Sequence, residues 1–174
     1  IGGIEVLKGS QSTLYGSDAV AGVIAIDTLG DVDPGLHHEV SVEGGSFGTV
    51  RGGYRLSGAS DTGKAAVSLH GLSTNGISSA LVNGDPMVDS GAGLENDPYR
   101  NITATFAGEQ RINEYFKIFG SGLLINSHAD YDDSGIPPTD NTVNFTRSTQ
   151  KAARVGFDLD LVDGRFRNTV SAQM

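Results

Sequence analysis

The stretch that decides the fold is Ala153-Arg-Val-Gly-Phe-Asp-Leu-Asp-Leu161. Apolar residues occupy positions 153, 155, 157, 159 and 161, and polar residues occupy positions 154, 158 and 160. Successive side chains of a β-strand point to opposite faces, so this period of two predicts a strand with one apolar and one polar face. Asp163-Gly164 then predicts a tight turn into a further alternating run that begins at Phe166.

The same period recurs along most of the chain. Seven strands are expected, over His38–Gly44, Thr49–Gly58, Lys64–Ser73, Asn101–Glu109, Tyr115–Asn126, Ala153–Leu161 and the run from Phe166. The fifth of them is apolar on both faces at its centre, so its phase stays open. After the first hairpin the connections alternate between about three residues and about twenty. Short turns at one end and long loops at the other are typical of an outer-membrane barrel.

These patterns predict an all-β fold, an antiparallel meander that forms part of a large transmembrane β-barrel. In this interpretation Val155, Phe157 and Leu159 face lipid, and the polar face lines a wet lumen. The same alternation also fits a soluble sheet with its apolar residues inside. An exported soluble β-domain that binds glycan or protein through acidic loops is therefore the alternative. A full-length sequence that ends in more alternating strands and a terminal aromatic residue would exclude it.

Composition narrows the choice of partners. The net charge of −9 argues against nucleic acid, which needs a basic face to displace counterions. No apolar run reaches the roughly 18 residues that a membrane helix requires, so membrane contact would be through strands. The chain has no cysteine, which excludes disulfides and thiolate chemistry. Because it opens in mid-element and stops inside an alternating run, we expect it to be a piece of a longer protein.

A separate small unit is expected before the barrel strands. It comprises a strand over Ile4–Leu7, a glycine turn, a short helical or looped passage and a second strand over Val23–Ile26. The turn-rich linker Gly30–Gly35 predicts the boundary with the sheet. The fold class is thus completed by a small mixed α/β unit at residues 1–35, ahead of the strands in residues 36–174.

This small unit resembles the end of the plug domain in TonB-dependent outer-membrane receptors. The motif residues that carry the resemblance are Leu14, Tyr15, Gly16, Ser17, Asp18 and Gly22, with Glu5 to Gly9 before them and Val23 and Ile24 after them. The chain departs from the family pattern at Gly3, Ser10, Ala25 and Asp27, where arginine, proline, asparagine and an apolar residue are usual. The resemblance implies that residues 1–35 are the C-terminal part of a plug with its linker, and that residues 36–174 are the first seven or so barrel strands.

The resemblance also implies a function. Receptors of this family take up a bulky, scarce metal chelate such as cobalamin or a ferric siderophore across the bacterial outer membrane. The expected partners are that ligand, outer-membrane lipid, and TonB, which would bind a segment outside this chain. No enzyme activity and no required cofactor are expected.

The two long loops are acidic. They contain Asp85, Asp89, Glu95 and Asp97 in the first and Asp130, Asp132, Asp133 and Asp140 in the second, without a lysine or arginine. Such loops would repel each other unless solvated or bridged by a hard cation such as calcium. Asp130 to Gly135 begins like an EF-hand loop, but Pro137-Pro138 interrupts the match and Asn141 stands where a bidentate glutamate is needed.

In the cobalamin-receptor branch of the family, calcium orders these loops. The resemblance implies Glu95, Asp97, Tyr131, Asp132 and Asp140 as its ligands here, although Ser78 or Ser79 stands where that branch has a further acidic residue. The alternative is that these are solvated surface loops. A secreted hydrolase that uses paired carboxylates such as Asp132 and Asp140 is another open interpretation. No serine, histidine and acid form a nucleophilic set in the sequence.

Overall fold

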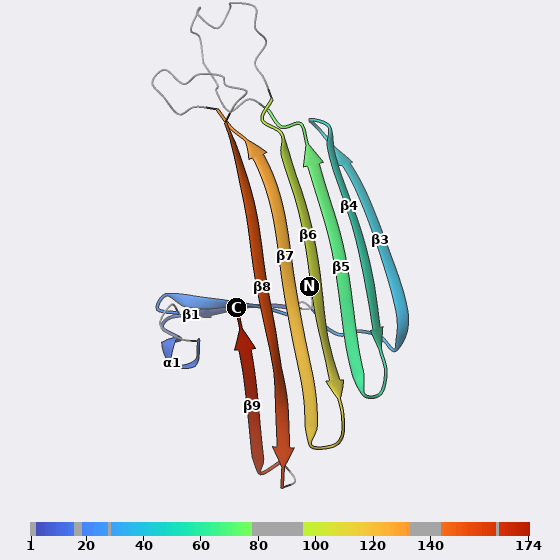
Figure 1. Ribbon diagram of the computed structural model, residues 1–174, viewed down its shortest axis with the longest axis vertical. Coiled ribbons are helices and arrows are strands. Elements are labelled where there is room, and N and C mark those ends of the chain that lie inside the picture. The colour runs from blue at the N-terminus through green and yellow to red at the C-terminus, as the bar shows by residue number, and fades with distance from the viewer. Residues whose placement is uncertain (1–2, 16–18, 28, 78–95, 133–143, 163) are drawn as a thin grey trace, which may run out of the picture.

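The structure is a computed structural model that describes residues 3–15, 19–27, 29–77, 96–132, 144–162 and 164–174. Seven strands form one sheet in chain order, and every neighbouring pair is antiparallel (Figure 1). They are β3 (Gly35–Gly45), β4 (Thr49–Ala59), β5 (Gly63–Thr74), β6 (Tyr99–Arg111), β7 (Phe116–Asp130), β8 (Phe145–Leu161) and β9 (Phe166–Gln173). The expected antiparallel meander of an all-β fold is confirmed.

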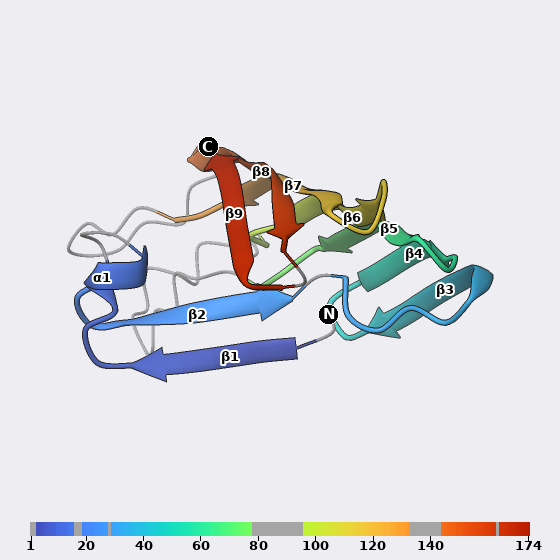
Figure 2. The ribbon, with the colours of Figure 1, turned by 90° about the horizontal axis from the view of Figure 1, so that it is seen from below.

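The N-terminal unit is a hairpin with one short helix in its connection. It consists of β1 (Gly3–Lys8), α1 (Ser12–Tyr15) and β2 (Gly22–Asp27), and β1 and β2 pair antiparallel. Figure 2 shows the seven-stranded sheet curving around, with the β1–β2 hairpin on its concave side. Within the described ranges, no helix is long and apolar enough to cross a bilayer.

Several strands are longer than the alternation indicates. β8 begins at Phe145 rather than at Ala153, and β7 continues to Asp130 rather than ending at Asn126. The reason is that residues 145–152 are mostly polar on both faces, so no apolar period marks them, whereas backbone pairing with β7 needs no such period. β3 also begins at Gly35, the last residue of the expected linker.

The register settles the phase of β7 that the sequence leaves open. Ile118 lies opposite Phe157, so it shares a face with the apolar residues of β8. Phe119 lies opposite both Glu109 and Gly156, and so points to the polar side. A strand that is apolar on both sides at its centre thus takes its phase from its neighbours.

The two faces of the sheet differ in chemistry over its whole width. We call the face of Val67, Phe106, Ile118 and Val155 the apolar face, and the face of Arg55, Lys64, Glu109, Lys117 and Asp158 the polar face. The apolar face is largely uncovered, since Val155 is 65% exposed and Val67 and Phe106 are each 49% exposed. Among the described residues the buried hydrophobic side chains are only those of Ala19, Ala66 and Ala107. The described chain therefore has no dry interior formed by its large apolar side chains.

Candidate functional site

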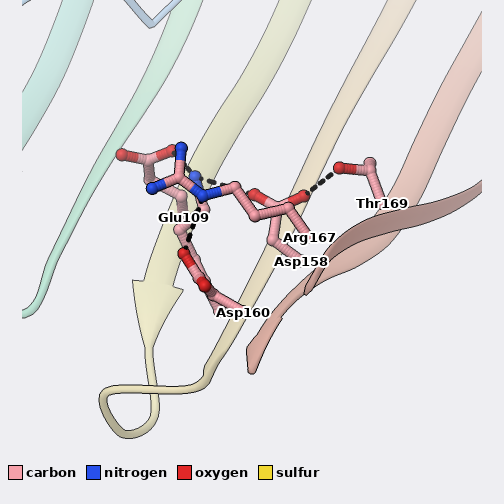
Figure 3. Close-up of polar contacts among 6 residues, drawn as sticks. Glu109, Asp158, Asp160, Arg167 and Thr169 are labelled. Carbon is pink, nitrogen blue, oxygen red and sulfur yellow. Dashed lines mark hydrogen bonds and ion pairs between the residues drawn. The ribbon is translucent and has the colours of Figure 1, made fainter. Parts of the chain in front are cut away.

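A network of charges joins four strands on the polar face. The Lys117 ammonium lies 3.0 Å from an Asp158 carboxylate oxygen and 3.3 Å from a Glu109 oxygen. The Thr169 hydroxyl donates a 2.7 Å hydrogen bond to the other Asp158 oxygen (Figure 3). One residue each from β6, β7, β8 and β9 is thus connected. The side chains of Lys117, Glu109 and Asp158 are each 34% exposed, so the network is half-buried.

A second ion pair lies beside this network. Arg167 on β9 contacts Asp160 on β8 at 3.0 Å, as Figure 3 shows. Asp160 and Asp158 lie on the same face of β8, two residues apart. Every one of these carboxylates has a cationic partner on a neighbouring strand, so the cluster braces the sheet across β6 to β9.

An aromatic ring is accommodated on the polar face by a glycine. Phe119 lies opposite Gly156, and the Arg154 guanidinium carbon lies 5.1 Å from the centre of its ring. A β-carbon added at Gly156 would lie 2.5 Å from the Phe119 ring and 2.5 Å from the Val170 carbonyl oxygen. The glycine at position 156 therefore leaves room on the polar face for the Phe119 ring.

The apolar face carries a shallow groove of about 720 Å³. Its floor includes Gly108 and Gly120, and its walls include Phe106, Val155 and Val170. A β-carbon at Gly108 would lie 3.5 Å from the Phe106 ring, so that ring rests over the glycines. The lining offers few convergent polar groups, which a site for a small polar substrate would need.

A turn after β2 ties the N-terminal unit to the polar face. The Asp27 carboxylate accepts hydrogen bonds from the backbone N–H groups of Leu29 at 2.9 Å and Gly30 at 3.1 Å. The carbonyl oxygens of the same two residues accept from the sheet, where Arg55 donates to Leu29 at 3.2 Å and Lys64 donates to Gly30 at 2.7 Å. Asp27 thus shapes the turn that Arg55 and Lys64 hold.

The hydrogen bonds to Asp27 predict a pH-dependent turn. The N–H groups of Gly30 and Leu29 hold the pKa of Asp27 below its ordinary value. Its stabilising contribution is therefore present above the unfolded-state pKa near 3.8 and is lost as the pH falls through the lower folded-state pKa. We expect Asp27→Ala to reduce hydrogen-exchange protection of the Leu29 and Gly30 amides about fivefold at neutral pH. Amide protection in Asp27→Asn, which keeps an acceptor oxygen, should lie between that of the wild type and that of Asp27→Ala.

The control for this prediction is Asp31→Ala, which removes a neighbouring exposed carboxylate. Hydrogen exchange followed by mass spectrometry on the full-length protein, corrected for intrinsic rates at each pH, would measure the effect. Equal protection in the wild type and Asp27→Ala would contradict the role given to this carboxylate.

The plug-like motif is described only in part. The backbones of Leu14 and Tyr15 form the end of α1, whereas Gly16, Ser17 and Asp18 lie outside the described residues. Gly22 begins β2 with φ of +152°, and a β-carbon there would lie 2.6 Å from the Leu7 carbonyl oxygen of the paired strand. The close approach of β1 explains why a glycine is required at this position.

The expected calcium ligands are also described only in part. The backbone N–H of Asp130 donates to the Pro98 carbonyl at 3.1 Å, which joins the start of β6 to the end of β7. This pairing brings Asp97 to the same end of the sheet as Tyr131 and Asp132; Asp132 is buried and Tyr131 is 48% exposed. Glu95 and Asp140 lie outside the described residues. Within the part that is described, no three or more His, Asp or Glu side chains gather as a metal site, so the calcium site stays a hypothesis.

Sequence reasoning missed the polar network around Lys117. Lys117 and Ser121 lie on the polar face of β7, but the apolar Phe119 stands between them on the same face and hides the alternation. It also missed the role of Asp27, because an Asx turn depends on where the following N–H groups point.

Comparison with known proteins finds a similar transporter. No family model matches the chain. The chain is similar to the vitamin B12 transporter BtuB of Photobacterium profundum, with 30% identity over 166 residues. The match covers 94% of this chain and 25% of the transporter, so the chain spans about a quarter of the length of the curated relative.

Proposed function

We propose that this chain is part of a TonB-dependent outer-membrane transporter. Residues 1–35 would be the end of its plug with the linker, and residues 36–174 would be the first strands of its barrel wall. The observation that carries the proposal is the uncovered apolar face of a curved antiparallel meander. The similarity to a vitamin B12 transporter along 94% of the chain supports it.

The width of the apolar face indicates the medium that surrounds it. A soluble monomer rarely exposes a contiguous apolar surface as wide as seven strands, whereas hydrocarbon stabilises such a surface. Every backbone N–H and C=O in a bilayer must be paired, so a spanning sheet has to close on itself. In the described chain β3 and β9 form the two edges and do not pair with each other. In the full protein these edges would pair with further strands.

The concave position of the β1–β2 hairpin supports a plug. A barrel of many strands encloses a wide lumen that leaks unless something fills it. The hairpin is held to the polar face by the contacts that Arg55 and Lys64 make with the linker. Moving a plug that is held in this way needs energy, which TonB would relay through a segment outside this chain. The proposal assigns no catalytic role to any residue.

The proposed cargo is a bulky metal chelate, either cobalamin or a ferric siderophore. Titration of the full-length receptor in detergent with cobalamin and with a panel of ferric siderophores, followed by fluorescence or calorimetry, would test this. Saturable binding of one class, together with uptake by cells that requires a functional TonB, is the expected result. Absence of binding to every chelate would contradict the assignment of the cargo. The position of the barrel wall in the membrane is tested separately, by the substitution Val155→Arg that is described in the Discussion.

A calcium site at the loop ends is part of the proposal and makes a prediction. Millimolar Ca²⁺ should increase chelate affinity about fivefold or more, because ordering the loops prepares the ligand mouth. The double change Asp97→Asn and Asp132→Asn should abolish this increase and leave the affinity measured in chelator unchanged. Asp31→Asn and Asp33→Asn, which remove two acids from the linker, serve as the control. An affinity of the wild type that does not respond to Ca²⁺ would end the proposed role of Glu95, Asp97, Tyr131, Asp132 and Asp140.

A further inference from the structure

We propose that Arg100, Arg147 and Lys151 form a binding surface for the phosphate groups of lipid headgroups. We call these three side chains the outer basic patch. The inference rests on the proposed function, because it takes the apolar face to be the lipid-facing side of a barrel. It goes further by assigning a headgroup chemistry to particular residues on that side.

The register gathers the patch at one end of the apolar face. Arg100 on β6 lies opposite His128 on β7, and His128 lies opposite Arg147 on β8. With strands about 4.8 Å apart, the Cα atoms of Arg100 and Arg147 are about 10 Å apart. Lys151 lies on the same face of β8, about 13 Å from Arg147 along the strand. All three side chains are exposed.

The patch is cationic within an acidic chain. The whole chain has a net charge of −9, yet among the described strands these three are the only lysine or arginine residues on the apolar face. The only acid on that face of the described strands is Asp130, and its carboxylate contacts His128 at 2.7 Å. No described acid forms an ion pair with Arg100, Arg147 or Lys151. As far as the structure describes the chain, their charge is therefore available to an external anion.

The level of the patch matches the edge of a bilayer. On β7 the apolar face runs from Phe116 to Leu124 and then turns polar at Asn126. At about 3.3 Å per residue and a tilt of about 40°, that apolar span is about 20–25 Å tall, close to the hydrocarbon band of outer-membrane barrels. Lys151 lies opposite Leu124 at the rim of this band, and Arg147 lies beyond it. Headgroup phosphates occupy this level.

Neighbouring side chains position the arginine of β8. The Arg147 guanidinium lies 5.0 Å from the centre of the Phe145 ring, and its Nε donates a 3.4 Å hydrogen bond to His128. The Phe145 and His128 rings stack with centres 5.4 Å apart. An exposed aromatic ring at this level is typical of the interfacial girdle of such barrels. A planar guanidinium held in this way suits two phosphate oxygens at once, and the long Lys151 stem can rise from the apolar band to the same level.

Lipid binding to the full-length receptor tests the patch. The receptor would be placed in nanodiscs of mixed phosphatidylglycerol and phosphatidylcholine, and its retained lipids measured by native mass spectrometry. Preference for the anionic lipid should fall about fivefold for each charge removed in R147Q/K151Q. The matched control R51Q/R111Q removes two exposed arginines from the polar face and should keep the wild-type preference. An unchanged preference in R147Q/K151Q would overturn the proposal.

Two further arms distinguish a lipid headgroup from free phosphate, and a lipid-covered apolar face from one in water. Inorganic phosphate at 10 mM should not displace the lipid, and displacement would assign the patch to free phosphate instead. V155C in a background without other cysteines should resist a membrane-impermeant maleimide in the same nanodiscs. Protected V155C without any headgroup preference would overturn the headgroup proposal alone, whereas labelled V155C would overturn the proposed function on which it rests.

Discussion

Val155→Arg is expected to destabilise the membrane-inserted full-length protein by about 2–4 kcal/mol. Val155 lies on the apolar face of β8 and is 65% exposed, so in the proposed barrel it points into hydrocarbon. An arginine there must either desolvate its guanidinium or extend to the interface, and both cost free energy. Urea unfolding of the refolded protein in lipid vesicles, followed by the shift in electrophoretic mobility between folded and unfolded forms, would measure the loss.

The chain offers a matched pair of controls on the same strand. Ala153→Arg places the same cation on the apolar face nearer the rim and should cost less than Val155→Arg, since the penalty falls toward the interface. Ala152→Arg places it on the polar face and should change stability by no more than about 0.5 kcal/mol. If Ala152→Arg were as costly as Val155→Arg, the orientation of the two faces would be wrong. Equal and small effects at all three positions would favour the exported soluble β-domain.

Gly156→Ala is expected to destabilise the barrel wall by about 3 kcal/mol, at the upper end of the cost of overpacking. The added β-carbon would lie 2.5 Å from the Val170 carbonyl oxygen, 2.5 Å from the Phe119 ring and 2.8 Å from Ser171. The Phe119 ring could turn aside, but the carbonyl oxygen belongs to the β8–β9 ladder and can move only by opening it. The same urea unfolding measurement applies.

Gly122→Ala is the control for this substitution. It also lies in the centre of the sheet, but its β-carbon would meet nothing closer than the Ala152 carbonyl oxygen at 3.9 Å. We expect a change within about 0.5 kcal/mol, and a slight gain is compatible with the lower chain entropy of alanine in the unfolded state. The double variant Gly156→Ala and Phe119→Ala separates the contact with the Phe119 ring from the backbone clash. If this double variant recovered full stability, the clash with the carbonyl oxygen would be refuted.

The two substitutions test different levels of the structure. Val155→Arg asks which medium surrounds the apolar face, whereas Gly156→Ala asks whether β9 lies where the register places it. A large loss of stability in Gly156→Ala with none in Val155→Arg would therefore support the register of β9 and contradict a lipid-facing apolar face. A large loss of stability in Val155→Arg with none in Gly156→Ala would support a lipid-facing apolar face and contradict the register of β9.

The loop residues show where prediction from the sequence stops. Asp97, Tyr131 and Asp132 come together at one end of the sheet because β6 and β7 are antiparallel neighbours, as the order of the expected strands indicates. Glu95 and Asp140 belong to the same hypothesis and lie outside the described residues. The Ca²⁺ titration therefore has to test the proposed site, because the described residues hold only part of the expected ligand set.

The alternation of polar and apolar residues by itself determined the all-β fold class of this protein, the number and order of the strands in the sheet and the apolar side of β4, β6 and β8. It could do so because a period of two is a local property of each strand and survives without knowledge of its neighbours. Only the tertiary structure decided the phase of β7, the true start of β8, the Lys117 network and the gathering of Arg100, Arg147 and Lys151. Each of these follows from the register between strands, because hydrogen bonds across the ladder decide which residues face each other over distances in sequence that no local pattern spans.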